Sequence, residues 1–186
     1  MISKIISGAQ VGADRGGLDA AIALGVPIGG WAPRGWLAED GTIPEVYRAH
    51  MRETASKSYP ERTRYNVRDS DATVIFRRVD SDGSRLTEEF CERLRRPYLL
   101  LAGDLVDDPE RCAPKIVRFL NELNDYRNQD SVVLNVAGNR ESRAPGIQRA
   151  VEAIMRLVIA DCPICAKCAC HHKTEDCEKY PGEAGQ

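Results

Sequence analysis

Short apolar runs alternate with longer amphipathic stretches along most of the chain. The apolar runs are rich in branched side chains, which is typical of strands buried on both faces. They occupy residues 2–7, 26–31, 72–76, 98–101 and 131–136. Between several of them, apolar residues recur three or four positions apart, which is the spacing of one face of a helix. The pattern therefore predicts strands that alternate with helices.

Capping residues, prolines and glycines indicate where the predicted helices begin and end. Asp108 and Pro109 fit the N-cap and the first position of a helix, and Pro145 is expected to start the last helix. The other predicted helices cover residues 14–24, 59–69 and 86–95, with a Pro- and Gly-rich loop at 32–44 and a turn at 80–84. Strands alternating with helices predict an α/β fold, a three-layer, Rossmann-like, doubly wound and mostly parallel sheet.

Composition divides the chain into two parts. Residues 1–160 carry the alternating pattern and are expected to form one domain, whereas residues 161–186 form a short Cys-rich C-terminal tail. The net charge of −2 gives no general attraction to nucleic acid or to an anionic membrane. No apolar run reaches the ~18 residues of a membrane span, and no signal peptide is recognisable. We therefore expect a cytoplasmic protein.

The clearest candidate for chemistry is the first strand–loop–helix corner, at residues 7–14. Its small residues let a phosphate approach the backbone, where a helix N-terminus offers unpaired N–H groups. Taken alone, the corner is equally consistent with a βα turn that binds nothing.

Further polar corners follow other predicted strands or precede them. They lie at residues 66–72, 82–87 and 134–146, where capping and surface charge are the alternative explanation. Corners that leave the carboxyl ends of parallel strands should converge on one face of the sheet, where such folds bind ligands. Together with the long loop, they give the candidate ligand-binding residues Gly8, Ala9, Gln10, Val11, Gly12, Asp14, Arg34, Glu39, Asp40, Asn66, Asp69, Ser70, Gly83, Ser84, Thr87, Ala137, Gly138, Arg140, Glu141 and Ser142.

The ordered motifs at residues 7–15, 29–33, 38–44, 62–73 and 134–142 closely resemble the molybdenum-carrier family. That family belongs to the SLOG group of Rossmann-like nucleotide-binding proteins. The resemblance covers roughly residues 2–160. It implies a pocket for a nucleotide-like or pterin-phosphate ligand such as molybdenum cofactor, and assembly as a homo-oligomer, a dimer or a tetramer.

Three positions depart from the patterns of the family and its relatives. Asp82 replaces the first glycine of a Gly-Gly-Thr turn, and Ala9 replaces a usual glycine, which is expected to add a Cβ near the pocket. In related phosphoribohydrolases a catalytic glutamate occupies the position of Thr87. A hydroxyl cannot serve as a carboxylate base, so this substitution argues against that hydrolase chemistry.

Two functions remain open from the sequence. The first is a carrier or sensor that binds a small phosphate-bearing ligand, a nucleotide or molybdenum cofactor, because no nucleophile–base pair is evident. The alternative is a nucleotide hydrolase or transferase of the SLOG type. In that case the candidate catalytic residues are Asp40 and Glu141.

The tail concentrates five of the seven cysteines of the chain between residues 162 and 177. Thiolates two residues apart can clasp one soft metal ion. The candidate metal ligands are Cys162, Cys165, Cys168, Cys170, His171 and Cys177. Zinc is the first choice and an iron–sulfur cluster the second, because the spacing does not match the ferredoxin pattern. The alternative is a tail with reduced thiols, and Cys91 and Cys112 are expected to be packing residues.

Overall fold

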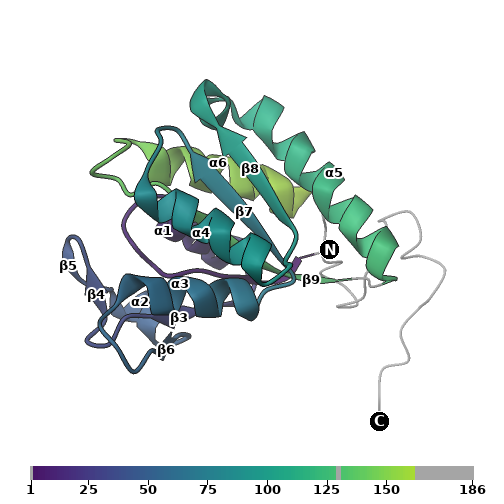
Figure 1. Ribbon diagram of the computed structural model, residues 1–186. Coiled ribbons are helices and arrows are strands. Elements are labelled where there is room, and N and C mark those ends of the chain that lie inside the picture. The colour runs from purple at the N-terminus through teal and green to yellow at the C-terminus, as the bar shows by residue number, and fades with distance from the viewer. Residues whose placement is uncertain (1, 129–130, 162–186) are drawn as a thin grey trace, which may run out of the picture.

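The computed structural model describes residues 2–128 and 131–161, and this part of the chain forms one α/β sandwich (Figure 1). Its central sheet holds strands β1 (Ile2–Ile6), β2 (Ile28–Gly29), β7 (Ala72–Arg77), β8 (Tyr98–Ala102) and β9 (Val132–Gly138) in the order β2-β1-β9-β7-β8. All neighbouring strands are parallel, with Ile5 opposite Leu134 and Ile75 opposite both Ala137 and Leu100. The expected doubly wound, parallel sheet is therefore confirmed.

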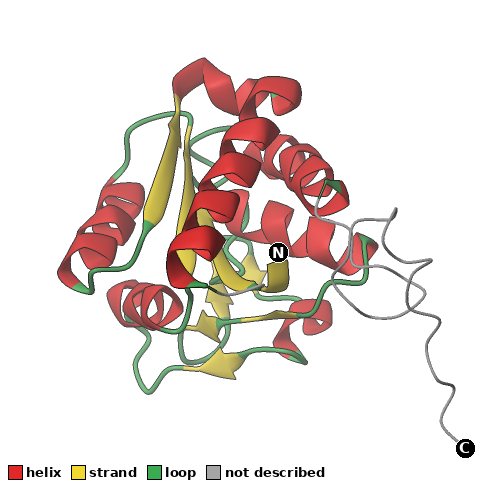
Figure 2. Ribbon diagram, turned by 90° about the vertical axis from the view of Figure 1, so that its right-hand side faces the viewer, coloured by secondary structure: helices red, strands yellow, loops and turns green. Residues whose placement is uncertain are grey.

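Helices cover both faces of the sheet (Figure 2). One layer contains α1 (Ala13–Ala23), α5 (Pro109–Arg127) and α6 (Ile147–Ala160), and α6 packs against both of the others. The other layer contains α3 (Tyr59–Arg68) and α4 (Asp82–Arg93), which pack together. A 3-10 helix, η1 (Gly103–Asp107), joins β8 to α5. No helix in the described ranges is both long and apolar enough to cross a membrane.

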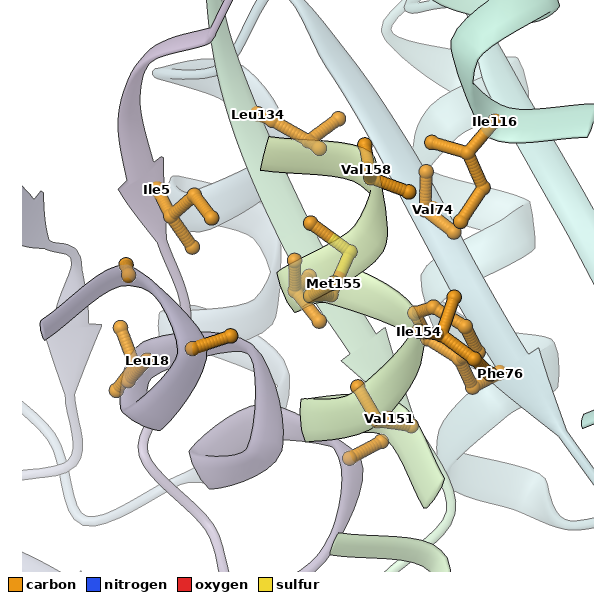
Figure 3. Close-up of a cluster of buried hydrophobic side chains, with 14 of the residues drawn as sticks. Ile5, Leu18, Val74, Phe76, Ile116, Leu134, Val151, Ile154, Met155 and Val158 are labelled. Carbon is orange, nitrogen blue, oxygen red and sulfur yellow. The ribbon is translucent and has the colours of Figure 1, made fainter. Parts of the chain in front are cut away.

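The core lies between the sheet and the α1–α5–α6 layer (Figure 3). Strand side chains meet Leu18 of α1, Ile116 of α5 and a stripe on α6 in this core. The stripe is made of Val151, Ile154, Met155 and Val158, which are all fully buried. Their spacing is that of one helix face, so the amphipathic pattern of this segment correctly predicts which face is buried.

The long loop after β2 is more structured than its composition predicts. It contains β3 (Trp31–Ala32), β4 (Leu37–Ala38) and β5 (Gly41–Thr42), followed by α2 (Glu45–Arg48) and β6 (Arg52–Glu53). Strands β4 and β5 form an antiparallel hairpin, and β3 pairs in parallel with β6. The predicted strand at 26–31 is divided because Gly30 has φ +127°, a conformation that brings its backbone close to the Ser7 carbonyl.

Two helix starts differ from the expectation. Helix α4 begins at Asp82 rather than after the predicted turn at 80–84, because the Ser81 hydroxyl accepts a hydrogen bond from the Ser84 N–H and caps the helix. Helix α6 begins at Ile147 rather than at Pro145, because Gly146 adopts φ +84° and cannot belong to a right-handed helix.

Candidate ligand-binding site

The loops that leave β1, β7 and β9 meet at the carboxyl edge of the sheet and enclose a pocket of about 460 Å³. Helix α3 closes one side. The lining residues are Gln10, Asp14, Tyr59, Arg62, Thr63, Asp80, Ser81, Asp82, Gly83, Leu86, Thr87, Ala137, Gly138, Asn139, Arg140 and Arg143. The corners at 7–14, 82–87 and 134–146 thus share one cavity, as their position after parallel strands predicts.

The β1 and β9 loops are joined through their backbones. The Glu141 N–H donates to the Val11 carbonyl at 3.0 Å, and the Ala13 N–H donates to the Asn139 carbonyl at 3.1 Å. Gly12 has φ +117°, and a Cβ there would lie 2.5 Å from the Asn139 oxygen. Only glycine permits this contact, so the small residues of the first corner serve loop-to-loop packing as well as ligand access.

Asn139 ties the β7 loop to the same assembly. Its side-chain oxygen accepts from the Val79 N–H at 3.0 Å, while its amide nitrogen donates to the Val79 carbonyl at 2.9 Å and the Ser81 hydroxyl at 3.0 Å. The residue is almost fully buried. It was not among the sequence candidates, although it lies between two of them.

An arginine from α3 reaches across the first loop. The Arg62 guanidinium lies against Gly8, where a Cβ would be 2.1 Å from its Nη1 atom. Nη1 donates to Asp14 Oδ2 at 3.2 Å, and the same oxygen accepts from the Gln10 N–H at 3.3 Å. Burial raises the pKa of the Asp14 carboxyl, and the nearby Arg62 charge opposes that rise. Arg62 belongs to a motif of the resemblance but was missing from the candidate set.

Gln10 carries an unsatisfied donor in the wall of the pocket. Its Oε1 atom accepts from the backbone N–H groups of Val11 at 3.1 Å and Glu39 at 2.8 Å. These two donors fix which end of the amide is the oxygen. The Nε2 atom is buried and has no hydrogen-bond partner among the described residues. A buried donor of this kind is costly unless something else accepts from it.

The pocket also holds arginines whose charges are not neutralised by an ion pair. Arg140 and Arg143 line it, and neither guanidinium has a hydrogen bond or ion pair with residues in the described ranges. The Tyr59 ring lies 4.8 Å from the Arg140 Cζ atom and 5.9 Å from that of Arg62. Of the three acids in the wall, Asp14 pairs with Arg62 and Asp80 with Arg85, and Asp82 is the third. The arrangement favours an anionic group near the three arginines.

The two candidate catalytic acids do not line the pocket. Asp40 accepts two hydrogen bonds from Arg15, at 2.7 and 2.9 Å, and this arginine lowers the pKa of the Asp40 carboxyl. Glu141 accepts from the Gly146 and Gln148 N–H groups and so caps α6. Glu39 accepts from the Ser142 hydroxyl at 2.7 Å. Each of these side chains therefore has a structural partner, and a catalytic role for Asp40 or Glu141 stays a prediction.

Most of the remaining candidates either line the pocket or lie in the loops that support it. Those that line the pocket are Gln10, Asp14, Gly83, Thr87, Ala137, Gly138 and Arg140. Gly8, Val11, Gly12, Glu39 and Ser142 lie in the supporting loops, and Ser84 is buried in the cap of α4. Thr87 donates to the Gly83 carbonyl, which is a local contact within α4.

Five candidates lie elsewhere. One of them, Arg34, is exposed and does not line the pocket. Asn66 bonds both backbone groups of Trp31, and Asp69 accepts from the Trp31 indole at 2.7 Å. Ser70 donates to the Val67 carbonyl, as expected for the capping alternative. Ala9 does not add a Cβ to the pocket, because it is fully buried in the hydrophobic core with φ +52°.

The predicted metal ligands Cys162, Cys165, Cys168, Cys170, His171 and Cys177 lie outside the described residues. Within the described ranges, no cluster of three or more His, Cys, Asp or Glu side chains could hold a metal ion. Cys91 and Cys112 are buried and unpaired there, and burial raises the pKa of each thiol to about 11. Both therefore lie in the packed interior, as predicted, and burial disfavours the reactive thiolate form.

Residues 5–159 match the family described as Circularly permutated YpsA SLOG family. The chain belongs to this family. A crystal structure described as "Putative molybdenum carrier protein", from Syntrophus aciditrophicus SB, is similar at 38% sequence identity and a TM-score of 0.72. The similarity covers 85% of this chain and 95% of that one. No curated protein matches the sequence.

The permutation of the family is visible in the sheet. If β9 and α6 are counted before β1, the order β2-β1-β9-β7-β8 becomes 3-2-1-4-5, the strand order of the Rossmann fold. In that fold, ligands bind where the order reverses, between the first and fourth strands. Here these strands are β9 and β7, and the loops after both line the pocket. The topology and the cavity therefore indicate the same ligand-binding position.

Proposed function

We propose that the protein binds a small phosphate-bearing ligand, a nucleotide or a pterin phosphate such as molybdenum cofactor, and acts as its carrier or sensor. The observation that carries the proposal is the pocket at the β9–β7 switch point. There, the guanidinium groups of Arg140 and Arg143 form no ion pair or hydrogen bond in the described part of the chain, and Gln10 has an unpaired buried donor. A phosphate group would satisfy all three.

The balance of charge in the wall supports an anion despite the nearby acids. Asp80 is paired with Arg85 and Asp14 with Arg62, so the two unpaired arginines, Arg140 and Arg143, face one remaining acid of the wall, Asp82. Leu86, Ala137 and the Tyr59 ring provide apolar surface for a heterocycle. A volume of about 460 Å³ falls in the range of small-molecule sites. The name of the Syntrophus protein supports the molybdenum-cofactor option by analogy.

The binding test is isothermal titration of the full-length chain with nucleoside monophosphates, a pterin phosphate and inorganic phosphate. The decisive variant is Arg140→Ser with Arg143→Ser. Charge-assisted hydrogen bonds contribute roughly 1.5–3 kcal/mol each, so loss of two should lower the affinity by at least about 100-fold. The control is Lys115→Ser with Arg149→Ser, which removes the same charge from exposed positions outside the pocket. Equal binding by both double variants, or no binding by the unsubstituted chain, would refute the proposal.

A second function, hydrolysis or transfer on a nucleotide, has one observation in its favour. Asp14 lines the pocket, and its raised pKa suits a general acid. Incubation with nucleoside monophosphates and product analysis tests it. Turnover that is lost in Asp14→Asn, with ligand affinity retained, would establish an enzyme. Binding without turnover in the unsubstituted chain would instead support the carrier or sensor function.

We also propose a cytoplasmic homo-oligomer, a dimer or a tetramer, with a zinc-binding tail after residue 160. The support is the family resemblance and the cysteine spacing in the sequence. Native mass spectrometry of the purified full-length chain and of a chain ending at Ala160 would measure the oligomer and the metal content. Equal metal content in the two forms would reject the tail site.

A further inference from the structure

A second, open cleft lies at the base of the β4–β5 hairpin, which projects from the sandwich in Figure 1. Its lining residues are Arg34, Gly35, Trp36, Glu53, Ala55 and Lys57. It has no lining residue in common with the pocket at the β9–β7 switch point. Anything that binds in the cleft would therefore occupy a separate site.

The backbone of Trp36 adopts a conformation that bulky residues avoid. Its φ is +54°, and the preceding Gly35 has φ +83°. The strain is held in place from both sides, since the Trp36 N–H donates to the Pro33 carbonyl at 2.9 Å and the Trp36 carbonyl accepts from Ile43 at 2.7 Å. Such strain in a bulky residue is uncommon and concentrates at functional positions. Here it holds a half-buried indole in the wall of the cleft.

The charges in the cleft complement an anion. Arg34 and Lys57 are exposed, and neither side chain has an ion pair or hydrogen bond within residues 2–128 and 131–161. The one acid in the wall, Glu53, accepts a hydrogen bond from the Gly35 N–H at 2.5 Å. Arg48 lies near the Trp36 ring, with its Cζ atom 6.0 Å from the ring centroid. The cleft therefore combines an aromatic surface with two cations that form no ion pair and one carboxylate, that of Glu53.

We propose that this cleft is a second binding site, for a small molecule that carries a planar aromatic ring and a negative charge. The ring stacks on the Trp36 indole, and the phosphate or carboxylate interacts with Arg34 and Lys57. Stacking and charge pairing are the two interactions that these side chains offer. The six lining residues suit a small ligand better than a protein partner, which needs an interface of roughly 1,000 Å² or more.

Tryptophan fluorescence of the full-length chain can test the site, because Trp31 and Trp36 are its two tryptophans. In Trp31→Phe, emission reports Trp36 alone. We expect AMP to change this emission saturably. Adenosine, which lacks the charge, and ribose 5-phosphate, which lacks the ring, should bind at least 10-fold more weakly. Benzoate distinguishes a carboxylate ligand from a phosphate ligand, and saturable binding of either AMP or benzoate supports the proposal.

Three variants separate this site from the first pocket. Arg34→Ser with Lys57→Ser should weaken the Trp36 response at least 10-fold, whereas Lys115→Ser with Arg149→Ser should leave it unchanged. Arg140→Ser with Arg143→Ser should also leave it unchanged, so failure of the first site would not imitate failure of the second. Equilibrium dialysis checks the result without replacing a tryptophan. It compares how much of the ligand is bound by the unsubstituted chain and by Arg34→Ser with Lys57→Ser. The double variant should bind one ligand fewer per chain at saturation.

Three results would overturn the proposal. The first is that neither AMP nor benzoate gives a saturable response in Trp31→Phe, and that the unsubstituted chain and Arg34→Ser with Lys57→Ser bind the same number of ligands in dialysis. The second is equal affinity for ribose 5-phosphate and AMP, which would indicate a simple anion site. The third is a saturable change of the Trp36 emission with an acidic peptide at concentrations where neither AMP nor benzoate binds, which would indicate a protein partner.

Discussion

Gln10 and Asp14 show how single residues can cost stability in order to shape a site. An unpaired buried amide nitrogen and a buried carboxyl with a raised pKa are both unfavourable in the folded protein. Both groups lie in the same wall, within one strand–loop–helix corner. A ligand that accepts from Gln10 and contacts Asp14 would offset these costs, so the site should be more stable when it is occupied.

The substitution Asp14→Asn tests this cost. Because burial raises the pKa of Asp14, the folded state binds its proton more tightly than the unfolded state does. Its contribution to stability is therefore fully present below 3.8, the ordinary pKa of an aspartate side chain, and is lost as pH rises through the folded pKa. We expect Asp14→Asn to be more stable than the parent chain at neutral pH and to show a flatter stability curve above pH 3.8.

Urea unfolding of both chains at several pH values measures this difference. Asp19→Asn is a control in the same helix, since it also removes a carboxyl but does not line the pocket. A variant that is less stable than the parent at neutral pH would show that the Arg62 pair outweighs the desolvation of Asp14. Weakened ligand binding in the more stable Asp14→Asn would identify the carboxyl as a group kept for function.

At the scale of elements, the β4–β5 hairpin and the start of α6 lie outside the pocket and stabilise the loops that form it. The hairpin turn holds Glu39 and Asp40, which bond Ser142 and Arg15. Sequence periodicity could not predict this hairpin, because strands of two residues contain no repeating pattern. Its Pro and Gly content indicates a loop, and the conformation of that loop depends on hydrogen bonds to residues distant in the sequence. For the same reason, the sequence alone could not show that Asp40 pairs with Arg15 or that Glu141 binds the first N–H groups of α6.

Removing the Asp40 carboxylate tests whether it is a brace. Arg15 is almost fully buried, and in Asp40→Ala its guanidinium would keep, among residues 2–128 and 131–161, the Ala9 carbonyl and the contact with the Tyr47 ring. Asp40 itself is half exposed, so we expect a loss of about 1–2 kcal/mol in the free energy of unfolding. Glu45→Ala, which removes an exposed partner of Arg48, should cost less than about 0.5 kcal/mol. Denaturant unfolding measures both.

The pH dependence of this brace has the opposite sign to that of Asp14. Arg15 lowers the pKa of Asp40, so the contribution of the pair is present above 3.8, the ordinary pKa of the side chain, and is lost as pH falls through the folded pKa. The difference between the parent chain and Asp40→Ala should therefore shrink in acid. An unchanged unfolding midpoint at neutral pH, combined with loss of turnover, would instead support the predicted catalytic role.

Glu141 should act on α6 rather than on a substrate. Its carboxylate accepts from the Gly146 and Gln148 N–H groups at the start of the helix, where unpaired donors and the helix dipole favour a negative charge. We expect Glu141→Ala to lower the free energy of unfolding by about 1 kcal/mol. Glu152→Ala, farther along α6 and paired with Arg156, should cost about 0.3–0.5 kcal/mol. Equal costs in thermal unfolding would contradict the capping role.

At the scale of the whole molecule, the sequence predicts the parts well and their arrangement only in part. The strands and helices of the main sandwich follow from short apolar runs and helical spacing, because burial demands those patterns. The position of β9 between β1 and β7 does not follow, since the β9–α6 unit has the same local pattern wherever it lies in the chain. Arg62 was missed for a related reason, because only tertiary packing brings α3 over Gly8.

The position of β9 leads to a prediction about the order of the chain. Helix α6, with 14 residues, runs back over the sheet for ~21 Å, and β9, with 7 residues, advances ~23 Å. The end of α6 therefore returns to the edge where β9 and β1 begin, since Ile2 lies opposite Val132. A flexible linker of about ten residues, with an average span of roughly 17 Å, should join Asp161 to Ile2.

A chain that begins at Ser131, continues to Asp161 and then runs through the linker from Ile2 to Asn128 would place the β9–α6 unit first. We expect it to unfold cooperatively, within about 2 kcal/mol of a linear chain ending at Asp161, because its packing contacts are unchanged. It should also keep the ligand affinity of that linear chain. A permutant opened between Arg143 and Ala144, inside the loop that lines the pocket, should fold less stably and lose binding. Similar behaviour of the two permutants would show that continuity of the β9–α6 loop does not form the site.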